Sequence, residues 1–151
     1  NQQYATSEMP YFGQELFEQA NAKGGLGEEA YISARSRARR LAGQEGIDAV
    51  LKPQKLDALV APTTGPAWLT DTAKGDAFPG AGYGAAAVAG YPSLTVPMGS
   101  SNGLPLGITF MGTAWSEPRL IELGYAYEQL TRARKPPEYR TSVAAQKSMA
   151  P

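Results

Sequence analysis

The dipeptide Asn102-Gly103 constrains the fold more than any other feature, because it lies between two apolar runs. Pro92–Gly99 reads PSLTVPMG before it, and Leu104–Gly112 reads LPLGITFMG after it. Asn and Gly both tolerate the positive φ that the tight turns of short hairpins require. The β-branched residues of the two runs favour extended backbone. We therefore predict a β-hairpin over residues 94–110.

The same turn carries a second pattern. Gly99–Gly103 reads GSSNG and fits G-x-S-x-G, the motif of a nucleophilic serine on a turn from strand to helix. The run that follows holds Pro105, Ile108 and Thr109, which make a poor helix start. The chain has no histidine and no cysteine, which excludes the Ser-His-Asp triad and thiolate chemistry. Both serines of the turn are therefore interpreted as turn residues.

Outside the hairpin, helical and extended patterns alternate. Apolar residues recurring at spacings of three and four predict helices; these cover 11–23, 28–44, 46–54, 83–91 and 116–134. Leu56–Pro66 predicts a short strand that runs into a loop of about 15 residues. The predicted fold class is α/β, part of a mixed β-sheet covered by helices. The stripes expected to be buried are Tyr31, Ala34, Ala38 and Leu41 in one helix and Leu120, Leu123, Tyr127 and Leu130 in the last.

Charge limits the classes of partner. Fourteen Lys and Arg balance 14 Asp and Glu, whereas nucleic-acid binding draws much of its affinity from neutralising phosphates. The arginines between residues 35 and 40 are therefore interpreted as a solvated or salt-bridged face. No apolar run reaches the length of about 18 residues that a membrane span needs. Asp71 and Asp76 are interpreted as turn residues, and neither a metal nor a cofactor is expected.

Four motifs follow one another in order between about residue 45 and residue 137. They are the DALVAPT strand at Asp57–Thr63, AGYPSLTVPMG at Ala89–Gly99, GLPLG at Gly103–Gly107 and the helix start at Ser116-Glu117. Together they resemble the C-terminal part of the amidase signature family. The stretches PTTGPAW and GYAYEQ make the sequence most similar to the peptide amidases within that family.

The resemblance implies hydrolysis of a carboxamide, such as the C-terminal amide of a peptide, by a Ser-Ser-Lys triad. One serine attacks, the second relays the proton and the lysine is the base, while backbone N–H groups hold the oxyanion. In the family these residues lie upstream of the matched region. No catalytic residue is therefore assigned here, and this chain alone is expected to be inactive. Lys52, Lys55 and Lys74 are expected at the surface.

The resemblance also implies that part of this chain lines the substrate pocket. The loop after residues 57–61 leaves the end of a strand, where open α/β sheets tend to bind ligands. Five residues are expected to line a pocket for a peptide-like or other small amide: Thr63, Thr64, Trp68, Phe78 and Tyr83. Residues 1–151 are expected to be a single segment, the C-terminal part of an amidase-signature domain, with a frayed tail at 138–151. The expected partner is the N-terminal remainder of the amidase.

Two other interpretations remain open at this stage. The chain could be a non-catalytic α/β binding or structural module that kept the fold without the activity. It could also be a hydrolase that uses Ser101 with a carboxylate or a lysine. The start at Asn1, not Met, adds the expectation of a fragment or a processed chain.

Overall fold

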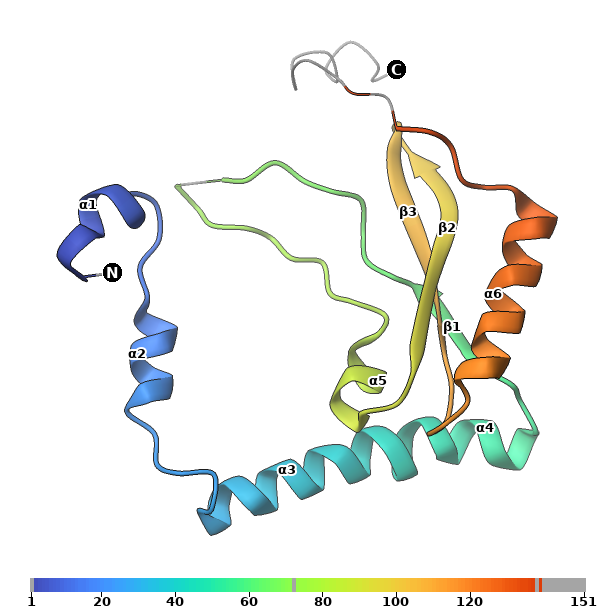
Figure 1. The fold of residues 1–151 in the computed structure, drawn as a ribbon, viewed down its shortest axis with the longest axis horizontal. Helices are drawn as coiled ribbons and strands as arrows, with labels where there is room; N and C mark the ends of the chain where they lie inside the picture. Colours follow the sequence, from blue (N-terminus) through green and yellow to red (C-terminus); the bar gives the residue numbers. More distant parts are fainter. Residues whose placement is uncertain (1, 72, 138, 140–151) are drawn as a thin grey trace. The chain divides into compact units, whose positions relative to one another are not determined.

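A computed structural model describes residues 2–71, 73–137 and 139 (Figure 1). The described parts of residues 1–37 and 69–77 form one compact unit, and those of residues 38–68 and 78–151 form the other. The boundary falls within helix α3 (Glu29–Ala42). Apart from Tyr139, the predicted tail at 138–151 lies outside the described residues. Within the described part, no helix is both long and apolar enough to cross a membrane.

The first unit consists of short helices and turns. It holds η1 (Gln2–Tyr4), α1 (Ala5–Glu8), α2 (Glu15–Asn21) and the first part of α3. None of its described residues is buried. The helix predicted at 11–23 forms only over α2, and its apolar side chains Leu16 and Phe17 are exposed.

The helix α3 continues through a π-helical turn, η2 (Gly43–Ile47), into α4 (Asp48–Gln54). The helices predicted at 28–44 and 46–54 are thus one helical run, which ends at Lys55 in the left-handed conformation. Its buried residues lie only in η2 and α4, because those segments pack against α5 (Gly84–Ala89) and the sheet. The prediction of a buried stripe is therefore wrong for Tyr31, Ala34, Ala38 and Leu41, all of which are exposed.

The sheet of the second unit has three strands in the order β1-β3-β2, paired antiparallel. They are β1 (Leu59–Pro62), β2 (Ser93–Ser101) and β3 (Leu104–Met111). The hairpin is confirmed: Asn102 and Gly103 join β2 to β3 with φ of 52° and 76°. No helix follows Ser101, which pairs with Leu104. The pairing register shifts between Pro97 and Gly99, so β2 carries an irregularity there.

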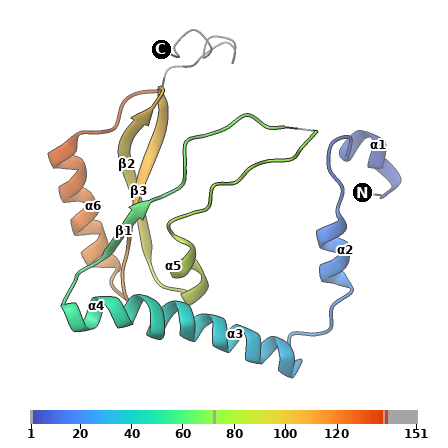
Figure 2. The same ribbon diagram turned by 180° about the vertical axis from the view of Figure 1, so that it is seen from behind.

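Helices cover both faces of this sheet (Figures 1 and 2). On one face, η2, α4 and α5 pack on Leu59, Ala61 and Met111. On the other, α6 (Glu117–Thr131) packs on the alternate residues, which include Val96 and Phe110. The α/β class with helices over a sheet is confirmed.

The C-terminal helix differs from its prediction in three details. It ends at Thr131, short of 134, because Arg132 adopts the left-handed conformation. Leu120, Leu123 and Tyr127 pack on the sheet as expected, but Leu130 is exposed because it lies in the last turn, beyond the residues that contact the sheet. Ser116 stands at the N-cap, yet its hydroxyl donates to the carbonyl of Thr113 and makes no capping bond.

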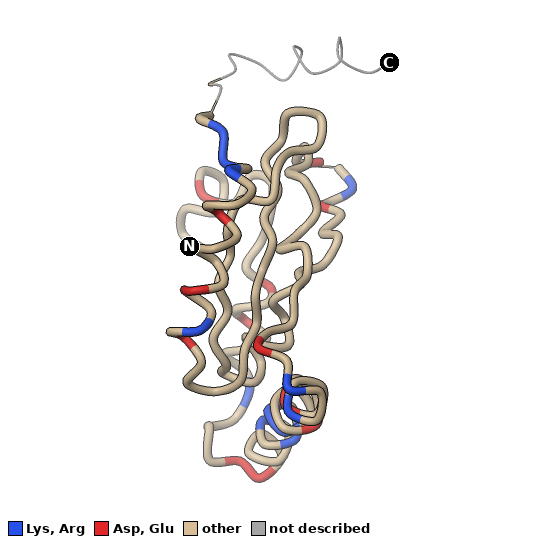
Figure 3. The backbone as a smooth tube through the Cα atoms, turned by 90° about the vertical axis from the view of Figure 1, so that its right-hand side faces the viewer, with Lys and Arg blue, Asp and Glu red and all other residues tan. Residues whose placement is uncertain are grey.

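Basic and acidic residues are interspersed along the backbone (Figure 3). Arg40, one of the arginines of α3, forms an ion pair with Glu45. This pair agrees with the interpretation of a salt-bridged face. The other three arginines, Arg35, Arg37 and Arg39, are exposed.

Candidate functional site

The loop that follows β1 leaves the end of the sheet at Thr63 and Thr64 and returns to it at Ala81 and Gly82. The Thr63 N–H donates to the carbonyl of Gly107 at 2.8 Å, which extends the pairing of β1 with β3 by one residue. The Thr63 carbonyl accepts from the N–H of Gly82 at 2.9 Å, and Thr64 forms a bridge with Ala81. Both ends of the loop are therefore held against the end of the sheet by backbone hydrogen bonds.

Two aromatic side chains of this loop form a pair. The ring centroids of Trp68 and Phe78 lie 6.0 Å apart at an interplanar angle of 55°. Both side chains are exposed, Trp68 at 44% and Phe78 at 59%. Tyr83, the residue before α5, is also partly exposed, at 38%. The loop thus presents aromatic surface that the described part of the chain leaves uncovered.

The Thr63 side chain belongs to a cluster of three threonines. Its Oγ1 lies 2.8 Å from the Oγ1 of Thr109 on β3 and 3.4 Å from that of Thr95 on β2. The hydroxyls of Thr95 and Thr109 also lie 2.8 Å apart. Thr109 is fully buried, which places the cluster partly inside the fold.

Sequence reasoning found Thr63 but missed Thr95 and Thr109. A signal was present, because each is a polar residue inside an apolar strand. The register makes Thr95 and Thr109 direct cross-strand partners, and it places Ala61 opposite Thr109 on the other side. The other expected threonine, Thr64, stands apart from the cluster, with its hydroxyl bonded to the carbonyl of Gly65 at 3.0 Å.

Two glycines allow the close packing at this end of the sheet. A Cβ at Gly107 would lie 2.7 Å from Thr63 Oγ1 and 2.8 Å from Thr95 Cγ2. A Cβ at Gly82 would lie 2.3 Å from the carbonyl oxygen of Pro62. A side chain at either position would push the threonine cluster or the returning loop away from the strands.

The first residue of α4, Asp48, carries a buried carboxylate. Asp48 is 7% exposed, and its Oδ2 accepts from Lys52 Nζ at 2.8 Å and from the Tyr91 hydroxyl at 3.0 Å. The hydrogen bond to Asp48 raises the pKa of Lys52. Burial, followed by the hydrogen bond to Asp48, raises the pKa of Tyr91.

Lys52, Lys55 and Lys74 are exposed, as expected. Among the described residues, Lys52 has a specific structural role as the partner of Asp48. Asp71 is a turn residue, as expected, because its Oδ1 accepts from the backbone N–H groups of Ala73 and Lys74. In the described ranges, no group of three or more acidic side chains is placed to hold a metal ion.

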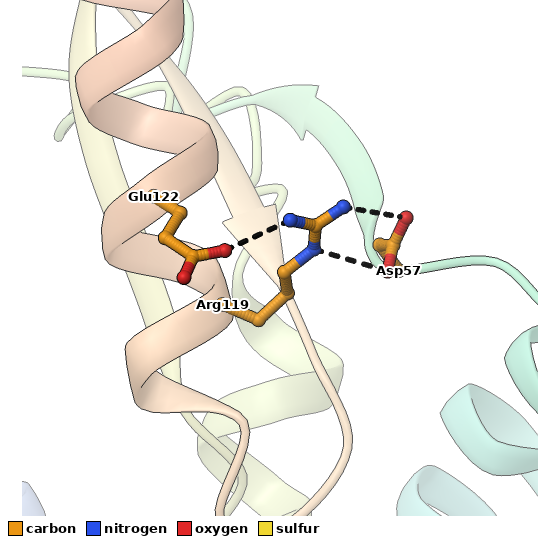
Figure 4. A network of polar contacts seen from close by, with 3 residues as sticks. All are labelled: Asp57, Arg119 and Glu122. Atoms are coloured by element: carbon orange, nitrogen blue, oxygen red, sulfur yellow. Dashed lines mark hydrogen bonds and ion pairs between the residues drawn. The ribbon is translucent and has the colours of Figure 1, made fainter.

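An exposed ion-pair network ties α6 to the segment before β1 (Figure 4). The Arg119 guanidinium donates to both oxygens of Asp57 at 3.1 Å, and to Glu122 at 2.8 Å. The hydrogen bonds from Arg119 lower the pKa of Asp57, and those to Asp57 and Glu122 raise the pKa of Arg119. The network fixes the start of β1, and the loop leaves from the other end of that strand.

Taken together, the end of β1 offers threonine hydroxyls, backbone carbonyls and aromatic faces. Such groups bind a polar organic ligand by hydrogen bonds and by contact with its apolar parts. This chemistry suits recognition of a ligand.

Comparison with known proteins shows which family this chain resembles in sequence and fold. The sequence model of the family described as Amidase matches residues 7–121. A probable amidase of Arabidopsis thaliana is 37% identical over 141 residues, which cover 92% of this chain and 24% of that protein. A putative amidase of Schizosaccharomyces pombe is 34% identical over 133 residues, which cover 87% of this chain and 22% of the relative.

Solved structures show that the fold is also similar to that of known amidases. The native peptide amidase of Stenotrophomonas maltophilia superimposes with a TM-score of 0.84 at 63% identity, over 93% of this chain and 28% of that one. A peptide amidase in complex with the competitive inhibitor chymostatin gives a TM-score of 0.88 at 65% identity, over 92% of this chain and 28% of that one. The chain thus spans about a quarter of the length of the relatives it matches. It belongs to the amidase family.

Proposed function

We propose that this chain is the C-terminal, substrate-binding portion of an amidase that hydrolyses peptide-like carboxamides, in the manner of the peptide amidases. One observation carries the proposal. Nearly the whole chain aligns with peptide amidases at 63–65% identity and a TM-score above 0.8. The more distant amidase family protein of Bacillus anthracis is 29% identical and reaches 0.70.

In this proposal the bond-breaking groups come from polypeptide outside this chain. The Ser-Ser-Lys chemistry of the family needs no histidine, and the sequence contains none. The partner of the chain is then the N-terminal remainder of the amidase, and the chain alone is inactive. Its own contribution is the wall of the substrate pocket.

The wall consists of Thr63, Thr64, Trp68, Phe78 and Tyr83. Three observations support this assignment. The residues lie on a loop or at its ends, both ends of the loop are fixed to the end of the sheet, and their aromatic side chains are partly exposed. Aromatic faces suit the apolar side chains of a peptide, and the threonines suit its backbone.

A graft tests the proposal directly. The matching quarter of the Stenotrophomonas maltophilia peptide amidase is replaced by this chain, and ammonia release from a peptide amide is measured. We expect the graft to hydrolyse the peptide amide and this chain alone to release no ammonia. Trp68→Ala in the graft should raise KM more than it lowers kcat, because the residue binds substrate.

Two controls make the result decisive. Leu130→Ala alters a residue that is 86% exposed on α6 and should leave both constants unchanged. Circular dichroism and thermal melting establish that the graft is folded. A folded graft that still reacts with a serine-directed fluorophosphonate but hydrolyses no peptide amide would contradict the proposed substrate class. Amide hydrolysis by the chain alone would contradict its role as a non-catalytic portion.

A further inference from the structure

The first compact unit carries large apolar side chains that nothing within it covers. In its described residues, 2–37, 69–71 and 73–77, no residue is buried. Four of the apolar side chains lie in α2 or just before it and are between 71% and 77% exposed: Tyr11, Phe12, Leu16 and Phe17. We call these four residues the α2 surface. A group of exposed apolar side chains of this kind marks an interaction site in soluble proteins.

Helix α2 has little to stabilise it by itself. It has 7 residues, whereas an isolated helix in water is marginal below about 12–15 residues. In the described part of the unit, the side chains of Gln2 and Gln14 donate to Glu18 of α2, and both bonds are exposed. Exposed hydrogen bonds replace bonds to water, so their net contribution is small. Without buried apolar area, nothing offsets the conformational entropy lost when the segment is ordered.

The charges around the α2 surface narrow the choice of partner. Residues 11–21 read YFGQELFEQAN, with two acidic residues, Glu15 and Glu18, and no Lys or Arg. Helices that bind a membrane surface carry basic residues on the polar face, so a lipid partner is disfavoured. A symmetric pair of copies would bring the same acidic helix against itself, and like charges at an interface oppose association. The chemistry therefore fits an apolar surface on a different polypeptide.

The length of the relatives identifies that polypeptide. The amidase family match begins at residue 7, so the α2 surface lies within the region that the family shares. The peptide amidase that superimposes over 92% of this chain is matched over only 28% of its own length. About three quarters of the peptide amidase therefore has no counterpart in this chain. The proposed function assigns the catalytic groups to that portion.

We propose that the α2 surface is the docking site for the catalytic portion of the amidase, and that α2 becomes a stable helix only when it docks. The inference rests on the proposed function, because the occupant is the catalytic portion named there. The second unit differs, since its sheet has buried clusters around Ile47 and around Val96. The second unit therefore folds without the catalytic portion, whereas the folding of α2 is coupled to binding.

Hydrogen–deuterium exchange tests the docking in two molecules, this chain alone and the graft into the Stenotrophomonas maltophilia peptide amidase. In this chain alone, the amides of β3 should be protected, and those of α2 should exchange at the rate of an unfolded peptide. In the graft, the amides of α2 should exchange at least about 100-fold more slowly. Light scattering measures the oligomeric state of this chain, and a parallel sample contains phosphatidylglycerol vesicles.

Two substitutions on the same helix separate docking from helix propensity. Phe17→Glu places a charge on the α2 surface and should return α2 exchange in the graft to within about threefold of its rate in this chain alone. Gln19→Glu adds the same charge at an exposed polar position and should keep the protection. If the graft fails to fold, a smaller graft that carries only residues 11–21 in the peptide amidase decides the matter with the same two substitutions.

The outcomes are distinct. Protection of α2 in the monomeric chain alone overturns the inference, because α2 then needs no partner. Protection that appears only in a dimer or only with vesicles assigns the surface to a second copy or to a membrane, and also overturns it. Rapid α2 exchange in a folded graft that hydrolyses a peptide amide overturns the inference and leaves the proposed function standing. A folded graft with protected α2 and no hydrolysis of a peptide amide supports the docking and contradicts the proposed function.

Discussion

The hydroxyl of Tyr91 donates a hydrogen bond of 3.0 Å to Oδ2 of Asp48, and this bond joins the segment after α5 to the first turn of α4. The carboxylate lies next to the π-helical turn η2, where the helical run meets the sheet. Within the described residues, its other oxygen, Oδ1, is buried and has no hydrogen-bond partner. Asp48 therefore depends on the two donors that reach Oδ2.

Tyr91→Phe should lower the free energy of unfolding by about 1–2 kcal/mol, because it leaves a buried carboxylate with one donor fewer. Urea denaturation at neutral pH, at an unchanged m-value, measures the loss. Tyr125→Phe is the matched control, since Tyr125 on α6 is 64% exposed. Equal stability of the two variants would show that the hydrogen bond contributes nothing net.

The same contact predicts a loss of stability in alkali. Burial and the bond to Asp48 raise the pKa of Tyr91, and the bond to Asp48 raises that of Lys52. A raised pKa in the folded state stabilises the fold below the ordinary pKa, and the stabilisation is lost as the pH rises through the folded value. Urea midpoints should therefore fall above about pH 10. The fall should be shallower in Tyr91→Phe, and an identical slope would refute the linkage.

Asp57 gives the opposite pH dependence. Its pKa is lowered by the hydrogen bonds from Arg119, so the pair stabilises the fold above the ordinary carboxyl pKa and the effect is lost as the pH falls through the lowered value. Arg119→Gln should raise the pKa of Asp57 toward the usual value near 4. A carboxyl-carbon NMR titration of Asp57 measures this change. Glu122→Gln is the control, because it keeps both bonds to Asp57; a shift of equal size there would contradict the assignment.

How far the sequence determined the fold depends on the range of the interactions involved. The hairpin was predictable because Asn102 and Gly103 form the turn from their own backbone preferences. Burial of the α6 stripe was predicted correctly at Leu120, where the helical period and the packing agree. The prediction was wrong at Leu130. Periodicity identifies a helix face, but the neighbours that pack against it decide whether that face is buried.

The candidate site shows the same limit. Thr63 was found because it follows a strand, which is a local signal. Its partners Thr95 and Thr109 lie 32 and 46 residues further along the chain. Only the register of β3 between β1 and β2 brings the three hydroxyls together. The role of Gly107 follows from the same register, and nothing local in the sequence indicates it.

Gly124 allows α6 to approach β2 closely. A Cβ there would lie 2.4 Å from Leu94 Cδ2 and 3.3 Å from Val96 Cγ1. Gly124→Ala should therefore destabilise the protein by about 1–3 kcal/mol through overpacking, despite the better helix propensity of alanine. Gly84→Ala in α5 is the matched control, because a Cβ there meets nothing within 4 Å. Thermal melting should separate the two variants, and a Gly124→Ala protein as stable as Gly84→Ala would contradict the close contact.

Gly107→Ala should disturb the loop after β1 from the strand side. The added methyl group would lie 2.7 Å from Thr63 Oγ1 and 2.8 Å from Thr95 Cγ2, so the threonine cluster must open or β3 must shift. We expect a loss of about 1–3 kcal/mol in the free energy of unfolding and, in the grafted enzyme, a rise in KM for the amide substrate that we propose. Thr95→Ser removes the Cγ2 carbon and keeps the hydroxyl, so the double variant should recover part of both losses. Because the two residues touch, their effects should couple by more than about 0.5 kcal/mol. If the effects of the two substitutions on the urea midpoint are strictly additive, the strain of Gly107→Ala lies somewhere other than the threonine cluster.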